Sequence, residues 1–264
     1  MVPVLIALCY DEAMEDKVAV VTGASYGIGE SIADALLKQG WKVYGLSRTK
    51  PKLNVSQFIW LQCDLSKPEQ IESTLKLVTE SEIGALVSNA GVIEIEKASA
   101  VSQSSYERTF SVNVLAPMLL VNALRDKIQS ATIVSISSVS DRIPEAEVAL
   151  YASSKAANTL YFNSLASELK NAKVYTLLPD YVDTPMQHAL SDGNPDFDWS
   201  SNLKASDIAR MTVDLVSGQR ELESGANVIM VTEKLKDDLQ SVEKLYGYNT
   251  DTKELTRLNP PNVS

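Results

Sequence analysis

Short apolar runs alternate with amphipathic stretches along most of this 264-residue chain, from residue 17 onward. The runs are rich in β-branched residues and apolar at successive positions, which is typical of strands buried on both faces. They occupy residues 17–22, 42–47, 58–63, 85–88, 132–137 and 173–178. Between them, helical patterns occupy residues 28–39, 66–80 (opening with a capping-box pattern at 66–69), 103–128 and 151–169. Strands that alternate with helices form parallel βαβ units, so we expect a single-domain α/β fold with a doubly wound parallel sheet in three α/β/α layers.

Two stretches break this alternation. Residues 185–202 are rich in Asp, Ser, Asn and Pro, which predicts a long loop, and from residue 232 the chain becomes charged, which predicts an irregular tail. Residues 2–9 are apolar but far short of the roughly 20 residues of a membrane span, and no basic segment of a signal peptide precedes them. This N-terminal segment either packs on the surface or reflects an upstream start, with Met14 as the alternative first residue. We therefore expect an extension at 1–16, one domain at 17–231 that includes the 185–202 loop, and a C-terminal tail at 232–264.

The composition excludes several kinds of chemistry. One histidine and two cysteines together supply fewer than the four ligands of a structural zinc site. Two cysteines cannot form a disulfide framework, which favours a reducing, cytoplasmic location. The formal net charge is −10, whereas proteins that bind nucleic acids or anionic membranes present basic surfaces. We expect no metal site, no nucleic-acid partner and no membrane partner.

A glycine-rich turn, TGASYGIG at residues 22–29, joins the first predicted strand to the first predicted helix. Its glycines permit a tight turn and a close approach of a ligand to the backbone. The helix start that follows offers free N–H groups and a favourable dipole to a pyrophosphate. Glycines alone are also compatible with an ordinary strand–helix connection. The expected cofactor contacts in this turn are Gly23, Ser25, Tyr26, Gly27, Ile28 and Gly29.

Tyr151 and Lys155 are four residues apart in a predicted helix, so their side chains share one face. Tyrosine ordinarily has a pKa of about 10. A neighbouring ammonium group favours the phenolate, and we expect it to lower the pKa of Tyr151 toward the range of a proton-transfer catalyst. Such pairs are also common on helix surfaces, so this pair indicates catalysis only in company with other residues.

These two motifs resemble the short-chain dehydrogenase/reductase (SDR) family, and within it the NADP(H)-preferring carbonyl reductases. The turn fits the family pattern TGxxxGxG in full, and the likeness extends over residues 17–231. The resemblance implies a Rossmann-type fold, a nicotinamide cofactor and two further catalytic residues. Ser138, thirteen residues before Tyr151, matches the serine that hydrogen-bonds the substrate carbonyl, and the spacing favours it over Ser137. Asn113, in the segment FSVNVLAP, matches the asparagine that helps hold a water linking the catalytic lysine to solvent.

The resemblance also implies cofactor contacts in turns that follow later strands. They are Asp64, Leu65, Asn89, Ala90, Gly91, Pro179, Val182 and Thr184, with Tyr151 and Lys155 close to the nicotinamide ribose. Two positions depart from the family pattern: Ser88 replaces an asparagine and Asp180 replaces a glycine. Aspartate tolerates the left-handed backbone region better than most residues, so we expect Asp180 to be accommodated in that conformation.

The end of the second predicted strand indicates which cofactor is preferred. A carboxylate about 20 residues beyond the glycines would bind the ribose 2′-hydroxyl of NAD. Here the chain has Ser47 and Arg48 instead, and a guanidinium suits a 2′-phosphate. We expect NADP(H), although the neighbouring Lys50 and Lys52 also fit an ordinary solvated basic surface.

Together these features predict NADPH-dependent reduction of a ketone, diketone or aldehyde to an alcohol, with Tyr151 as the general acid. The 185–202 loop contains Met186, His188, Phe197 and Trp199, which suit an apolar or aromatic substrate; the sequence offers His188 no evident partner. The alternatives are an NADP-dependent sugar, polyol or secondary-alcohol dehydrogenase, and a non-catalytic NADP(H)-binding regulator. The resemblance also implies a homodimer formed by the helices of Asn113 and Tyr151. A tetramer is left open, because residues 229–234 do not match the usual tetramer strand.

Overall fold

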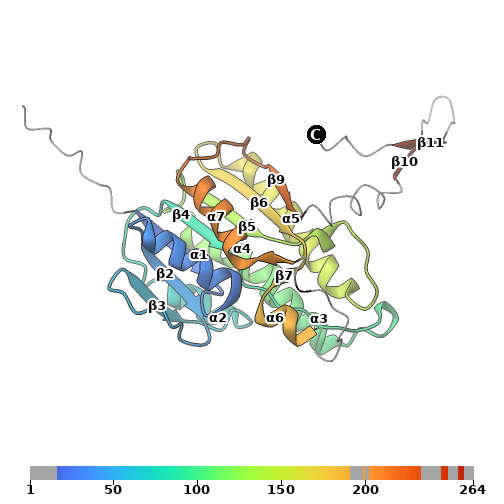
Figure 1. Cartoon of the computed structure of the whole chain (residues 1–264), viewed down its shortest axis with the longest axis horizontal. Helices are drawn as coiled ribbons and strands as arrows, with labels where there is room; N and C mark the ends of the chain where they lie inside the picture. Colours follow the sequence, from blue (N-terminus) through green and yellow to red (C-terminus); the bar gives the residue numbers. More distant parts are fainter. Residues whose placement is uncertain (1–16, 191–198, 200–201, 233–244, 249–254, 259–264) are drawn as a thin grey trace, which may run out of the picture.

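Seven parallel strands form a central sheet in the order β3-β2-β1-β4-β5-β6-β9 (Figure 1). The computed structural model describes residues 17–190, 199 and 202–232, and the strands at 245–248 and 255–258. The sheet strands are Val18–Thr22 (β1), Lys42–Ser47 (β2), Phe58–Gln62 (β3), Ala85–Ser88 (β4), Thr132–Ile136 (β5), Lys173–Pro179 (β6) and Asn227–Met230 (β9). The direction in which successive strands are added to the sheet reverses between β1 and β4. Such a reversal opens a crevice at the carboxyl ends of the strands.

Helices cover both faces of the sheet. Gly27–Lys38 (α1) and Ala205–Val216 (α7) lie on one face, whereas Pro68–Leu75 (α2), Ala116–Leu124 (α4) and Ala149–Glu168 (α5) lie on the other. Successive side chains of a strand point to opposite faces, so Val18 and Val20 pack toward α2, α4 and α5 while Ala19 and Val21 pack toward α1 and α7. The expected single-domain, three-layer α/β/α fold is confirmed.

The helix predicted at 103–128 is interrupted. It divides into Gln103–Phe110 (α3), a π-helical turn at Ser111–Leu115 (η2), and α4. Pro117 explains the interruption, because proline has no N–H to donate and its ring clashes with the carbonyl group four residues earlier, here that of Asn113. The Asn113 carbonyl, freed from the helix ladder, accepts a hydrogen bond from Asn158 Nδ2 of α5 (3.0 Å).

Two predicted connections also differ. The capping box at 66–69 does not form: Lys67 is the N-cap of α2, and the Ser66 hydroxyl instead donates to Asp64 Oδ1 (2.8 Å). The predicted 185–202 loop begins with the short helix Pro185–Leu190 (α6). Val182–Asp183 (β7), which precedes this loop, pairs in parallel with Leu203–Lys204 (β8), which follows α6 in the chain. Phe197 lies outside the described residues.

In the predicted irregular tail at 232–264, Leu245–Tyr248 (β10) and Leu255–Leu258 (β11) form an antiparallel pair. The extension at 1–16 lies outside the described residues. In the parts of the chain that the structure describes, no helix is both long and apolar enough to cross a membrane.

Candidate active site

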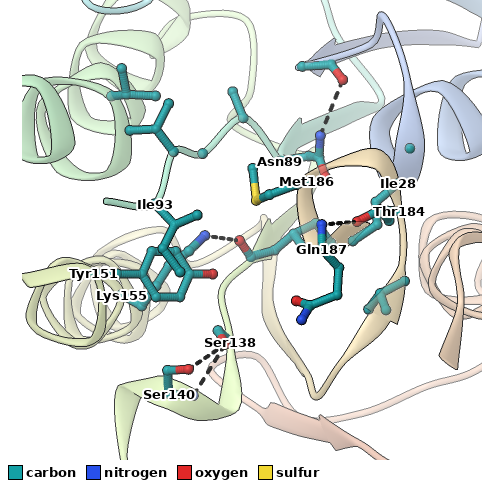
Figure 2. A pocket seen from close by; sticks show the side chains of 18 of the residues that line it. Ile28, Asn89, Ile93, Ser138, Ser140, Tyr151, Lys155, Thr184, Met186 and Gln187 are labelled. Carbon is teal, nitrogen blue, oxygen red and sulfur yellow. Dashed lines mark hydrogen bonds between the residues drawn. The ribbon is translucent and has the colours of Figure 1, made fainter. Parts of the chain in front are cut away.

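A cavity of about 850 Å³ lies at the carboxyl ends of the strands. Its lining contains every predicted site residue except Gly29 and Asn113. Figure 2 shows Tyr151 and Lys155 projecting from α5 toward the cavity, with Ser138 close to them and Met186 and Gln187 coming from α6. Motifs that are spread over most of the domain therefore line one continuous cavity.

Each glycine of the glycine-rich turn is required by its backbone conformation or by close neighbouring atoms. Gly23 and Gly27 have φ values of +69° and +66°, which favour glycine. A Cβ atom on Gly29 would lie 2.2 Å from the Gly23 carbonyl oxygen, so α1 packs directly on the turn. The first residues of α1 line the cavity, where a helix N-terminus favours a phosphate group. The turn therefore fits a dinucleotide cofactor.

Thr22 ties this turn to the turn after β4. Its Oγ1 accepts hydrogen bonds from the backbone N–H groups of Asn89 (2.9 Å) and Ala90 (3.0 Å). Asn89 Nδ2 donates back to the Thr22 carbonyl (2.9 Å). The sequence reasoning missed the role of Thr22, although it opens the TGxxxGxG pattern and lies at the end of a buried strand.

The other end of the cavity is lined by Ser47 and Arg48 at the end of β2 and by Asp64 and Leu65 after β3. Ser47 is buried, whereas Arg48 is exposed at the cavity rim. Burial opposes ionisation of Asp64, but hydrogen bonds from Ser66 and the nearby charge of Arg48 hold the pKa of that carboxyl below its usual value. Arg48 thus brings a positive charge to this end of the cavity.

Tyr151 and Lys155 lie on one face of α5, as their spacing predicted. Lys155 Nζ is 5.6 Å from the centre of the Tyr151 ring and donates to the Ile136 carbonyl (3.0 Å). Burial lowers the pKa of Lys155 to about 8, and the charge of Asp141 partly opposes this shift. Burial also raises the pKa of Tyr151 to about 12, and a hydrogen bond with Ser138 partly opposes it. The net lowering of the Tyr151 pKa that the sequence led us to expect is therefore not found, because burial dominates.

The two neighbouring serines at the end of β5 point in different directions. Ser137 donates to the Lys155 carbonyl (3.2 Å) and accepts from the Thr159 hydroxyl (2.8 Å), so it anchors α5 to the sheet. Ser138 lies at the start of a short 3₁₀ helix, Val139–Asp141 (η3). Its hydroxyl exchanges hydrogen bonds with Ser140 (3.2 Å) and also reaches Tyr151. The geometry therefore favours Ser138 over Ser137 as the residue available to a substrate.

Asn113 is fully buried in the π-helical turn behind the cavity wall. Its Oδ1 accepts from the Val92 N–H (2.8 Å), and its Nδ2 donates to the Val92 carbonyl (2.9 Å) and to Ser154 Oγ (2.9 Å). Both amide protons are therefore used. The side chain fixes the loop after Gly91 and, through Ser154, the first turns of α5.

Two details near the ends of β6 and β7 differ from expectation. Asp180 does not adopt a left-handed backbone, since Glu147 is the non-glycine residue with positive φ among those the structure describes. Its Oδ1 instead accepts from the Tyr181 N–H (2.9 Å). His188 has a partner, because its Nε2 lies 2.8 Å from Asp183 Oδ1.

The comparisons with known proteins agree with this geometry. The family model for short chain dehydrogenases matches residues 17–195. The chain belongs to the SDR family. Like other members, it is therefore an oxidoreductase by family, with a site for a nicotinamide cofactor.

Individual SDR relatives are similar over most of the chain. Dehydrogenase/reductase SDR family member 11 of Bos taurus is 29% identical, covering 85% of this chain and 99% of the relative. An uncharacterised oxidoreductase of Methylorubrum extorquens is 33% identical over 66% of this chain and 77% of the relative. The ligand-free aldohexose dehydrogenase of Thermoplasma acidophilum has 26% identity and a TM-score of 0.74, covering 81% of this chain and 92% of that structure.

Proposed function

We propose that this SDR protein is an NADPH-dependent oxidoreductase that reduces a ketone, diketone or aldehyde to an alcohol. The observation that carries the proposal is the convergence of Ser138, Tyr151 and Lys155 on the same cavity as the glycine-rich turn. A cofactor-binding module without chemistry needs no such set, which argues against the regulator. The nicotinamide, when bound, supplies the hydride.

The residues of the chain then handle the oxygen and its proton. Tyr151 holds its proton at all physiological pH values, since its pKa is raised to about 12, and it donates that proton to the substrate oxygen. Ser138 hydrogen-bonds the same oxygen and stabilises the negative charge that develops there. Lys155 places a positive charge beside the tyrosine and favours loss of its proton during the reaction. Asn113 holds the loop and the start of α5 on which these groups depend.

The decisive experiment is NADPH consumption against a panel of aldehydes, ketones, diketones and keto-sugars, alongside NADP⁺ reduction with sugars, polyols and secondary alcohols. Turnover with simple carbonyl compounds supports the proposal. Turnover with sugars or polyols alone favours the dehydrogenase alternative, which the aldohexose dehydrogenase relative makes worth testing. Tight NADPH binding without turnover on either panel would identify a regulator.

The proposed cofactor preference rests on Arg48 and on the lack of a carboxylate at position 47. The double variant Ser47→Asp, Arg48→Ala should reverse the preference from NADPH to NADH, because it supplies a partner for the 2′-hydroxyl and removes the partner of the 2′-phosphate. Dissociation constants for both cofactors provide the measurement, and Lys50→Ala is the control for general loss of positive charge. Unchanged NADPH affinity in the double variant would refute the assignment of Arg48.

Carbonyl reduction should slow above about pH 8. Lys155 has its pKa lowered to about 8, so its ammonium form predominates below that pH and falls about tenfold per pH unit above it. We expect kcat/KM to be level below the break and to decline above it. Asp141→Asn should move the break to lower pH, since the negative charge of Asp141 raises the pKa of Lys155. A break that stays in place in this variant would have to come from another group.

We further propose a cytoplasmic homodimer formed through the surfaces of η2 and α5. Leu115 and Leu160, which lie on these elements, are 40% and 68% exposed, as expected for apolar residues that a second copy covers. Light scattering of the purified protein tests the dimer, and a monomeric mass would exclude it. Fractionation of cells tests the cytoplasmic location.

A further inference from the structure

The segment Ser47-Arg48-Thr49, which begins at the last residue of β2, is held by side chains of the neighbouring strand. Trp60 of β3 donates its indole N–H to Ser47 Oγ (3.1 Å) and lies 3.3 Å from the Ser47 carbonyl oxygen. The parallel register places Trp60 beside Gly45 and Gln62 beside Ser47, so these side chains share one face of the sheet. Trp60 itself is not among the residues that line the cavity.

Each carbonyl group of this segment has a hydrogen-bond donor. The Ser47 carbonyl accepts from the Cys63 N–H (3.1 Å) as well as from Trp60. The Arg48 carbonyl accepts from Gln62 Nε2 (3.3 Å), and the Thr49 carbonyl accepts from Ser47 Oγ (2.8 Å). The backbone is therefore fixed at three successive residues, while the Arg48 side chain is left exposed at the cavity rim.

The hydroxyl of Ser47 is engaged in both directions. It donates to the Thr49 carbonyl and accepts from Trp60, so its one proton is not available to an anion. An anionic group at this end of the cavity must then depend on the Arg48 guanidinium and on backbone N–H groups. Guanidinium binds phosphate best in a fixed, bidentate geometry, which makes the position of the Arg48 backbone important.

We propose that Trp60 is a positioning residue for cofactor choice: its indole N–H holds the Ser47–Thr49 segment so that Arg48 can bind the 2′-phosphate of NADPH. The inference rests on the proposed preference for NADPH. It assigns part of that preference to a residue of β3 that does not touch the cavity. NADPH and NADH differ only in the 2′-phosphate, so a displaced Arg48 weakens NADPH binding and leaves NADH binding unaffected.

The test compares dissociation constants of NADPH and NADH, measured by calorimetry, in wild-type protein and in Trp60→Phe. Phenylalanine keeps an aromatic ring in β3 and removes the N–H. We expect NADPH affinity to fall about 3- to 10-fold, as loss of one neutral hydrogen bond allows, with NADH affinity unchanged. Trp41→Phe is the matched control. Trp41 is 5% exposed, packs against Gly84 and is absent from the cavity lining, so its variant should keep the ratio of the two constants.

A second variant, Gln62→Leu, acts on the same segment through an exposed side chain and decides the matter if Trp60→Phe does not fold. Like Trp60→Phe, it should lower NADPH affinity and leave NADH affinity unchanged. Equal weakening of NADPH and NADH binding in these variants would show a merely structural role and overturn the inference. If the wild-type protein prefers NADPH, variants that keep the wild-type ratio of the two dissociation constants would overturn it as well. Wild-type protein that binds both cofactors equally would instead refute the proposed NADPH preference itself, and the inference with it.

Discussion

Replacing Tyr151 by phenylalanine is expected to lower turnover of carbonyl substrates by about 10²- to 10⁴-fold, the range that a general acid contributes. The ring remains and only the hydroxyl is lost, so the packing of α5 and the glycine-rich turn should be preserved. NADPH affinity should therefore change little. Steady-state kinetics with the best substrate of the panel and a binding titration with NADPH give the two measurements.

The matched control is Tyr161→Phe, the same substitution on the same helix. Tyr161 packs against the core cluster between the sheet and α5 and does not line the cavity. Its variant should retain wild-type turnover. Activity of Tyr151→Phe within tenfold of wild type would rule out Tyr151 as the proton donor.

A methyl group on Gly29 should abolish cofactor binding and destabilise the fold. The added Cβ would lie 2.2 Å from the Gly23 carbonyl oxygen and 2.5 Å from Asn89 Nδ2, and the first of these is backbone that has little freedom to move. The helix α1 must then shift away from the turn. We expect a loss of about 1–3 kcal/mol in the free energy of unfolding, as for an overpacked core position, together with loss of measurable NADPH binding.

Gly40→Ala separates this crowding from the general effect of losing a glycine. Gly40 has a φ of +79° and nothing within 4 Å of an added Cβ, so its substitution strains the backbone without a clash. Its cost should be about 1–2 kcal/mol, with cofactor affinity retained. Thermal unfolding and NADPH titration of both variants give the comparison, and normal NADPH binding by Gly29→Ala would contradict the proposed approach of cofactor to the turn.

The parts of this molecule that could be predicted from sequence are those whose signal is local. The strands were visible as apolar runs in the sequence. The residues within the glycine-rich turn lie close together in the chain, and so do Tyr151 and Lys155. Pro117 also left a readable signal, four residues after Asn113, but the long helical pattern around it concealed the π-helical turn.

What the sequence could not predict depends on which distant groups meet. Trp60 lies beside Ser47 only because of the register between β2 and β3. Tyr181 donates to Glu145 (2.8 Å) across two loops that follow different strands. The pKa of Tyr151 was misjudged for a related reason: the spacing showed its neighbour Lys155 but not the burial that outweighs it.

Pro117 has a consequence for how variants of this protein are chosen. Because it has no N–H to donate to the Asn113 carbonyl, that carbonyl accepts a hydrogen bond from Asn158, which lies on α5 three residues beyond Lys155. A residue with no atom at the cavity therefore helps to determine where the catalytic helix sits. A mutational library restricted to residues that line the cavity would omit position 117. Yet proline at this position, because it has no N–H, leaves the Asn113 carbonyl free to accept the hydrogen bond that joins η2 to α5.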